Sequence, residues 1–228
     1  MSGGDDVEAA REHGWREVAA IDEAYRSGRL DRAGWHDAVR ALIEPSYLGA
    51  ATAEAGSGHG GTPEEWEATR GPIMAAIERD GDLLDVGCAN GLLMESLRRW
   101  GDERGLRIEP YGVDISPAIA EVARTRLPHW ADRIWAANAA TWRPPRRWDY
   151  VRTGLEYVPD DRGRELVEHL LAAYVAPGGR LIVGKSNERR DRPDIGARLR
   201  SWGLDPTGEL RLPHAHPGLE MTWYWIDA

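Results

Sequence analysis

The chain lacks several residue types on which other protein classes depend. Its 228 residues include one cysteine, no phenylalanine and one lysine. A single cysteine excludes an intramolecular disulfide framework. No apolar run approaches the roughly 20 residues that a membrane-spanning helix needs, so we expect no membrane partner. The first residues lack the basic and apolar regions of a secretory signal, and we therefore expect a cytoplasmic protein.

Excess positive charge is also absent. A net charge of −9 argues against a strong electrostatic grip on nucleic acid, which needs clustered positive surface. The basic pairs Arg146-Arg147 and Arg189-Arg190 are interpreted as solvated loop charges. Arginine supplies nearly all of the positive charge, Lys185 being the exception, and we attribute this bias to the nucleotide composition of the source genome. We predict no nucleic-acid partner.

What is present is the composition of an ordinary globular protein, with 42% hydrophobic and 29% charged residues. A chain of this length forms one large domain, or one domain with a cap. Eleven tryptophans in the absence of phenylalanine leave two interpretations open: the indole rings fill the core, or some of them line an aromatic pocket.

The first 80 residues have a helical pattern. Apolar residues at turn spacing predict a helix over residues 8–27 and a second helix that Asp31 caps and Pro45 ends. Thr62 and Glu65 form a capping box that begins a third helix. We therefore predict an N-terminal helical cap or lid over residues 1–80.

From residue 81 onward, predicted strands and helices alternate. Alternating βα units indicate an α/β fold whose mostly parallel sheet is covered on both faces. A C-terminal hairpin closes the chain. The predicted strands span residues 83–86, 109–113, 133–137, 149–152, 180–184, 209–212 and 221–226.

The segment from Asp85 to Gly91, with the sequence DVGCANG, lies where the strand of residues 83–86 ends and a helix begins. Backbone N–H groups are exposed at such a junction, and the helix N-terminus carries partial positive charge. Ligands of open α/β sheets bind outside the carboxyl ends of the strands. The segment therefore predicts a polar ligand.

This segment resembles the D-x-G-x-G-x-G loop of class I S-adenosylmethionine-dependent methyltransferases, with Ala89 in place of the middle glycine. Alanine disfavours positive φ, so we expect the loop to pass Ala89 in an ordinary backbone region. Cys88 is interpreted as a packing residue behind the cofactor, not as a nucleophile. The resemblance implies that the loop binds S-adenosylmethionine, the product being S-adenosylhomocysteine, through Asp85, Gly87, Cys88, Ala89, Asn90 and Gly91.

The resemblance also implies a fold and further cofactor contacts. The fold is a Rossmann-like, doubly wound, mostly parallel seven-stranded sheet over residues 81–228, with an antiparallel C-terminal hairpin. Asp114 closes the second strand, where a carboxylate accepts hydrogen bonds from both ribose hydroxyls; the alternative is an acid at a helix N-terminus. Ile115 covers the adenine, and Asn138 and Ala139 face its amino group unless Asn138 is an ordinary turn residue.

The fourth strand leads into the segment from Thr153 to Tyr157, which in this family runs beneath the methionine end of the cofactor. Thr153 and Gly154 are expected to offer backbone contacts there. Glu156 and Tyr157 are expected to face the substrate.

Two residues outside the βα region are further candidates for cofactor binding. Arg70 lies one helix upstream of the loop, where its guanidinium can pair with the methionine carboxylate. A surface arginine on a polar helix face is an equal alternative. Tyr47 is a similar candidate.

A glycine-rich segment at residues 56–61 matches G-x-G-x-x-G. No strand precedes it, which excludes a dinucleotide-binding loop, and we interpret it as a hinge or lid. His59 at its centre is either solvent-facing or delivered to the substrate on closure. His214 and His216 share one strand face, but the sequence supplies no third ligand nearby, so no metal site is expected.

The sequence therefore predicts a methyltransferase that acts on an O or N atom of a small molecule, with a natural product or other secondary metabolite as first choice. The mechanism is in-line displacement, which needs a base only for a protonated acceptor. The alternatives are a protein or nucleic-acid methyltransferase and a non-catalytic S-adenosylmethionine-binding partner subunit. Monomer and homodimer both stay open. The candidate catalytic residues are His59, Glu156, Tyr157, His214 and His216.

Overall fold

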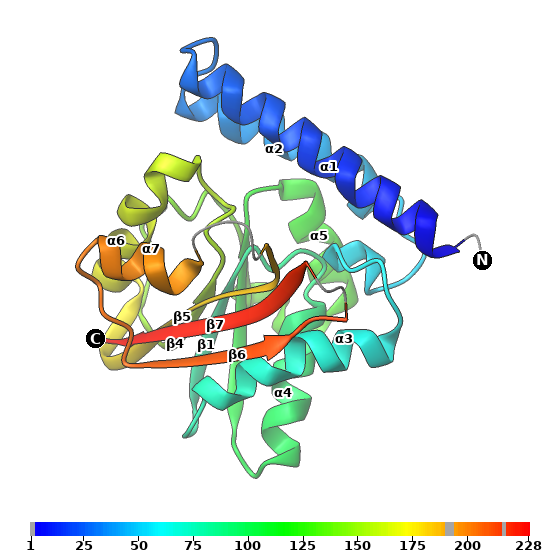
Figure 1. Ribbon diagram of the computed structural model, residues 1–228. Coiled ribbons are helices and arrows are strands. Elements are labelled where there is room, and N and C mark those ends of the chain that lie inside the picture. The colour runs from blue at the N-terminus through cyan, green and yellow to red at the C-terminus, as the bar shows by residue number, and fades with distance from the viewer. Residues whose placement is uncertain (1–2, 190–193, 216–217) are drawn as a thin grey trace.

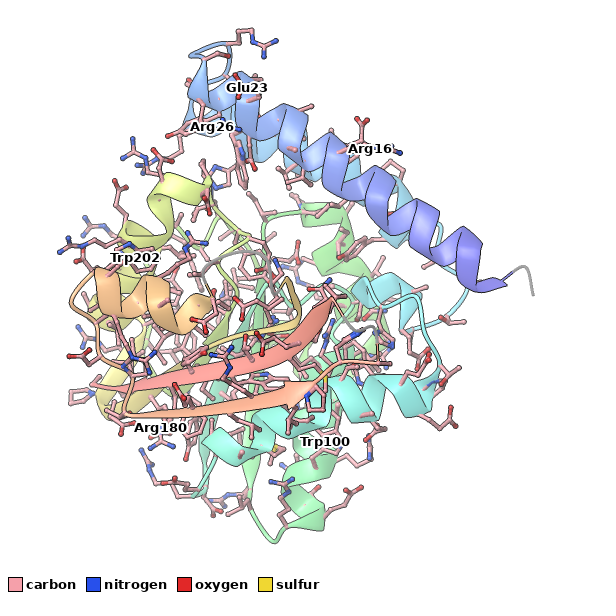
Figure 2. All side chains as sticks on the ribbon, viewed as in Figure 1. Arg16, Glu23, Arg26, Trp100, Arg180 and Trp202 are labelled. Carbon is pink, nitrogen blue, oxygen red and sulfur yellow. The ribbon has the colours of Figure 1, made fainter. Side chains whose placement is uncertain are left out.

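The computed structural model describes residues 3–189, 194–215 and 218–228. Two long helices, α1 (Gly3–Arg26) and α2 (Arg32–Leu48), lie side by side across one side of the sheet domain (Figure 1). Asp31 caps α2 as predicted, since its carboxylate accepts a hydrogen bond from the Gly34 N–H at 2.8 Å. Near the C-terminal end of α1, the exposed side chains of Arg26 and Glu23 form an ion pair (Figure 2).

The predicted end of α2 at Pro45 is wrong, because the helix continues to Leu48. Proline removes one backbone donor from the helix. Pro45 lies in the last turn, so the loss is a single hydrogen bond, and the Gly49 N–H still donates to the Pro45 carbonyl at 3.0 Å.

Short helical segments connect α2 to the sheet. They are η1 (Ala55–Ser57), α3 (Pro63–Arg70) and η2 (Gly71–Ala76). The capping box at the start of α3 is confirmed: the Glu65 N–H donates to Thr62 Oγ1 at 3.2 Å, and Glu65 Oε2 accepts from the Thr62 N–H at 2.8 Å.

The sheet has seven strands in the order β3-β2-β1-β4-β5-β7-β6, which confirms the predicted fold class. The first five strands are parallel to one another, whereas β7 runs antiparallel to β5 and to β6. The strands are β1 (Gly81–Val86), β2 (Ile108–Asp114), β3 (Ile134–Ala136), β4 (Trp148–Thr153), β5 (Val175–Arg189), β6 (Gly208–Pro213) and β7 (Leu219–Asp227).

Helices cover both faces of the sheet (Figure 1). Side chains of α4 (Leu92–Glu103) and η2 pack on the face that includes Leu83. Side chains of α6 (Gly163–Ala173) and α7 (Ile195–Ser201) pack on the opposite face, which includes Leu84. A third cluster joins α5 (Pro117–Arg126) to Cys88 of the loop after β1, to Met94 of α4 and to Ile134 of β3. Neighbouring leucines are thus both fully buried, as expected for a central parallel strand.

Tryptophan and tyrosine supply the aromatic rings of the core in this chain, which has no phenylalanine. Trp148 is fully buried, and its ring contacts those of Tyr111, Trp135, Trp142 and Tyr174 at centroid distances of 5.9 to 6.5 Å. The four ring pairs are tilted or edge-to-face. Two of the neighbours, Tyr111 and Trp135, also stack on each other. The core accounts for most of the unusual aromatic composition.

Strand β5 is longer than the predicted segment of residues 180–184. Its second half pairs with β7 after a register shift between Lys185 and Glu188. Since Thr153 at the end of β4 pairs with Val183, β5 continues beyond the carboxyl end of its parallel neighbour. Within the described ranges, no helix has the length and apolar character needed to cross a bilayer.

Candidate active site

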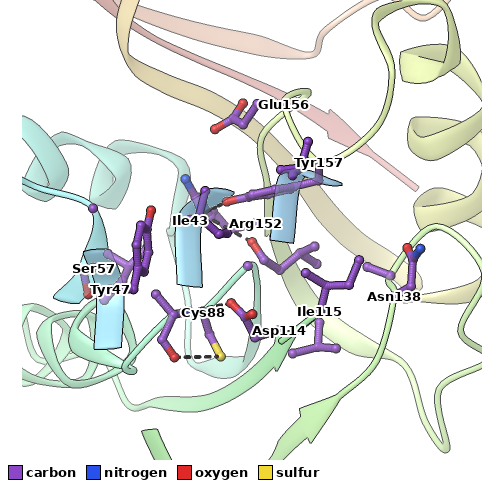
Figure 3. A pocket seen from close by; sticks show the side chains of 18 of the residues that line it. Ile43, Tyr47, Ser57, Cys88, Asp114, Ile115, Asn138, Arg152, Glu156 and Tyr157 are labelled. Carbon is purple, nitrogen blue, oxygen red and sulfur yellow. Dashed lines mark hydrogen bonds between the residues drawn. The ribbon is translucent and has the colours of Figure 1, made fainter. Parts of the chain in front are cut away.

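A cavity of about 350 Å³ lies at the carboxyl ends of β1, β2, β4 and β5 (Figure 3). This volume falls in the range of small-molecule sites. The sheet side includes the loop after β1 and the ends of the neighbouring strands. The helical side is formed by Val18 of α1 and by Trp35, His36, Val39, Ile43 and Tyr47 of α2.

The loop after β1 has three residues with left-handed backbone. Gly87 and Gly91 have φ of 74° and 79°, and Ala89 has φ of 49°. The expectation of an ordinary backbone region at Ala89 is therefore wrong. The physical reason is a hydrogen bond from the Ala89 N–H to Asp114 Oδ2 at 3.0 Å, which offsets a conformational cost of roughly 1–2 kcal/mol. The loop keeps the glycine-type conformation without the glycine.

Asp114 ends β2 and is 7% exposed. Its Oδ2 accepts from Ala89 and its Oδ1 accepts from the Ser116 N–H at 2.9 Å. Burial raises the pKa of the carboxyl, and these two backbone hydrogen bonds act in the opposite direction. Each carboxylate oxygen has a further lone pair, so Asp114 retains acceptor capacity toward the cavity that it lines.

Arg152 of β4 lies opposite Asp85 of β1 in the parallel register. Its Nη1 contacts Asp85 Oδ1 at 3.2 Å and donates to Tyr157 Oη at 3.1 Å and to the Val86 carbonyl at 3.4 Å. Burial raises the pKa of Asp85, while Arg152 lowers it. Asp85 does not itself line the cavity, but it pairs with Arg152, which does.

Arg70 lines the cavity, so it is not a surface arginine. Its guanidinium lies 5.2 Å from the ring centroid of Trp66. Within the described residues it has no carboxylate or carbonyl partner. Burial, together with the positive charge of Arg152, lowers the pKa of Arg70 to about 10. A desolvated cation without an anion is costly, which favours an anionic ligand group at this position.

Tyr157 and Glu156 follow β4 and line the same cavity (Figure 3). Glu156 is exposed at the rim. Burial raises the pKa of the Tyr157 phenol. The Tyr157 ring also lies against Gly87, because a Cβ built there would be 2.5 Å from Tyr157 Cζ. Only glycine leaves room at this point of the loop.

Other predicted cofactor contacts divide into two groups. Cys88, Ile115, Asn138 and Ala139 line the cavity, as do Gly87, Ala89 and Tyr47. Asn90, Gly91, Thr153 and Gly154 lie behind its surface.

Asn90 connects the loop to the glycine-rich segment. Its Oδ1 accepts from Ser57 Oγ at 2.5 Å and its Nδ2 donates to the Ala53 carbonyl at 2.8 Å. The segment that we predicted as a hinge is therefore packed on the loop, and Ser57 and Gly58 line the cavity.

Two of the predicted histidines, His59 and His214, are not among the residues that line the cavity. His59 packs edge-to-face on Trp66, with ring centroids 5.7 Å apart, and burial lowers its pKa. His216 lies outside the described residues. The described part of the chain has no group of three or more His, Cys, Asp or Glu side chains arranged to hold a metal ion.

Sequence reasoning missed several residues that line the cavity. His36, which is not among the residues singled out from the sequence, is 5% exposed, and its Nε2 lies 3.2 Å from the Tyr157 carbonyl. Arg152 was passed over within its strand. Lys185, Ser186 and Asn187 follow a strand that was predicted to end at residue 184. Side chains alternate between the two faces of a strand, so the pattern around Tyr150 could have drawn attention to Arg152, two residues further on. No local sequence pattern marks His36.

A model of the methyltransferase domain family matches residues 60–225. This match covers well over half of the chain. The chain belongs to the methyltransferase domain family. The Rossmann-like class I fold and the resemblance predicted from the loop are thereby confirmed.

Solved structures show where this methyltransferase stands among its fold neighbours. The 1,6-didemethyltoxoflavin-N1-methyltransferase of Burkholderia thailandensis, solved with 1,6-didemethyltoxoflavin and S-adenosylhomocysteine, has a TM-score of 0.53 at 15% identity, over 95% of this chain and 89% of the other. The geranyl diphosphate C-methyltransferase of Streptomyces coelicolor has a TM-score of 0.53 at 13% identity, over 81% and 87%. At such identities the likeness establishes the fold.

A sequence relative is trans-aconitate 2-methyltransferase of Methylobacterium radiotolerans. It is 38% identical over 103 residues, which are 44% of this methyltransferase. The matched segment spans only 36% of the length of that relative.

Proposed function

We propose that this methyltransferase uses S-adenosylmethionine to methylate an O or N atom of a small molecule, of the natural-product or secondary-metabolite type. The observation that carries the proposal is the cavity of about 350 Å³ between the carboxyl ends of the strands and α1–α2, with Asp114 and the β1 loop on its surface. A concave site of this size suits a cofactor with a small acceptor better than a polymer.

The residues on the cavity surface fit the parts of this cofactor. The free acceptor sites of Asp114 suit the ribose hydroxyls, and Ile115 and Asn138 suit the adenine. Because Gly87 has no side chain, the loop can pass close to Tyr157 at the cavity. A Cβ at this position would collide with the Tyr157 ring. Arg70, a half-buried cation without a hydrogen-bond or ion-pair partner among the described residues, suits the methionine carboxylate. Tyr47 lies on the same side of the cavity.

The bound cofactor supplies an electrophilic methyl group. The protein must then align the acceptor and exclude water. We propose that residues 1–80 act as the cap that does this. Two contacts between α2 and the sheet domain support it: His36 Nε2 with the Tyr157 carbonyl at 3.2 Å, and Ser116 Oγ donating to Glu44 Oε1 at 2.6 Å.

Glu156 is the candidate base for an acceptor that must lose a proton. It lines the cavity and is exposed, so a proton that it accepts can pass to solvent. The raised pKa of Tyr157 makes a phenolate there unfavourable near neutral pH.

A small-molecule acceptor is consistent with the names of the similar proteins, which mention 1,6-didemethyltoxoflavin, geranyl diphosphate and trans-aconitate.

Calorimetric titration tests the proposal. S-adenosylmethionine should bind and NAD should not. Asp114→Ala should weaken cofactor binding by about 10- to 100-fold, as for loss of a hydrogen-bonded charge. Exposed Asp132→Ala is the matched control and should bind normally. Because Asp114 also holds the Ala89 N–H, the unfolding midpoint of each variant is measured alongside. Tight NAD binding, or normal S-adenosylmethionine affinity in a folded Asp114→Ala variant, would falsify the assignment.

A further inference from the structure

Lys185 is the only lysine of the chain, and it lines the candidate active site. Every other basic residue is arginine. A composition bias toward arginine explains the majority, but not why the exception lies at the cavity. A lysine ammonium is a compact point charge with three donors, unlike the broad guanidinium fork. Where the space beside an anionic ligand group is narrow, a lysine ammonium therefore fits better than a guanidinium.

Strand β5 places Lys185 at the acceptor side of the cavity. Lys185 is two residues beyond Val183, which pairs with the last residue of β4. The proposed ribose contact, Asp114, ends β2, and β2 and β5 are separated in the sheet by β1 and β4. A cofactor whose ribose lies at β2 and whose methionine lies at the β1 loop leaves the β4–β5 side for the acceptor.

A second, much smaller cavity of about 10 Å³ adjoins the first at Lys185. Arg70, Arg152 and Ser186 line both cavities together with Lys185. Ile73, Leu93 and Trp223 add apolar surface. The space suits a single small polar atom, such as a water oxygen or one oxygen of an anion. Apolar neighbours reduce screening, so an anion is held more strongly here than at the surface.

The acidic groups of the neighbourhood do not balance these three cations. Asp85 is paired with Arg152 at 3.2 Å. Glu188 is buried and accepts hydrogen bonds from Thr222 Oγ1 and from the Ile195 N–H. Glu156 is exposed at the rim. Lys185 and Arg70 act on Glu188 and Glu156 through longer-range electrostatics. Neither cation forms a direct ion pair with a residue in the described ranges, so both retain donors for a ligand.

We propose that the small acceptor carries a carboxylate that binds between Lys185 and Arg152, with one oxygen in the small cavity and Ser186 as an additional donor. This proposal deepens the proposed function and rests on it. Arg70 is then left for the methionine carboxylate of the cofactor. Two ligand carboxylates thus meet the two cations that lack a direct ion pair among the described residues, and the acceptor belongs to the class of small carboxylic acids.

The test compares Lys185→Met, Lys185→Arg and the matched surface control Arg104→Met, all in the full chain. Each variant is titrated with S-adenosylmethionine. Each, loaded with S-adenosylhomocysteine, is then titrated with a panel of di- and tricarboxylic acids, the primary amides of those acids, and phosphate monoesters of similar size. Methyl transfer from radiolabelled S-adenosylmethionine to every panel member is measured in parallel.

We expect one or more carboxylic acids to bind and their amides not to. Lys185→Met should weaken acid binding by about 10- to 100-fold, with Lys185→Arg intermediate and Arg104→Met unchanged. S-adenosylmethionine affinity should be the same in all four proteins. No acid binding at about 10 mM, equal binding of amides, a preference for phosphates, or an insensitive Lys185→Met variant overturns the carboxylate site. If the unmodified protein does not bind S-adenosylmethionine, the proposed function is overturned instead.

Discussion

The buried pair of Arg152 and Asp85 gives a prediction whose size follows from the structure. The Arg152 side chain is 15% exposed and that of Asp85 is 2% exposed. Arg152→Met keeps much of the side-chain length and removes the charge. It leaves the Asp85 carboxylate buried without its cation, a situation that costs about 3–5 kcal/mol. Because Arg152 retains some solvent contact, we expect a loss near the lower limit, about 3 kcal/mol in the free energy of unfolding.

Urea denaturation of a double-mutant cycle measures this effect. Asp85→Asn in the Arg152→Met background removes the uncompensated charge, so the double variant should regain about 1–2 kcal/mol relative to Arg152→Met alone. A double variant no more stable than Arg152→Met would refute the argument that the unpaired carboxylate is the cause.

The pH dependence gives an independent check on the same variant. Burial already raises the pKa of Asp85, and Arg152→Met removes the cation that lowers it. The folded protein then binds a proton at Asp85 more tightly than the unfolded chain, whose aspartates titrate near 3.9. Stability of Arg152→Met should therefore fall as pH rises from about 4 toward 7, relative to the unmodified protein. A pH-independent difference in unfolding free energy contradicts this assignment.

Two further predictions concern the loop and the segment packed on it. Gly87→Ala and Gly178→Ala both place alanine at φ near 74°, but only the former meets an obstacle, Tyr157. We expect Gly178→Ala to lower the free energy of unfolding by about 1 kcal/mol. Gly87→Ala should lower it by at least about 2 kcal/mol more and should also weaken cofactor binding. Equal losses of the two variants in urea denaturation would exclude the clash. Ser57→Ala removes the hydroxyl bound to the loop, at a local cost of about 1 kcal/mol. Limited proteolysis at residues 50–61 should then accelerate and slow again with cofactor, and unchanged cleavage would mean that this bond does not hold the segment.

The sheet and the capped helices could be predicted from the sequence because their signals are local. Thr62 and Glu65 sit at capping-box spacing, and the apolar runs of β1 and β4 each stand between turn residues. The end of β5 has no such signal, because its extension depends on pairing with β7, which lies 30 to 47 residues further along the chain. The cavity residues at the end of β5 were missed for that reason.

The conformation of Ala89 was mispredicted for a related reason. Residue type alone argues against φ of 49° for alanine. The compensating acceptor, Asp114, is 25 residues away and reaches Ala89 only through the parallel pairing of β1 with β2. His36 is another case, since its burial follows from the way α2 packs on the sheet domain, which the helix's own pattern does not specify.

One hydrogen-bonded path connects α2 to the loop through Asp114. Glu44 of α2 accepts from Ser116 Oγ, the Ser116 N–H donates to Asp114, and Asp114 accepts from Ala89. A ligand hydroxyl that competes for the Asp114 oxygens therefore acts on the group that fixes both the loop backbone and the anchor of α2. Because alanine pays a conformational cost in the left-handed region that glycine does not, the conformation of Ala89 depends on its hydrogen bond to Asp114. Ala89 thus connects the loop to the anchor of α2 through Asp114, by a hydrogen bond that a glycine at residue 89 would not need for its conformation.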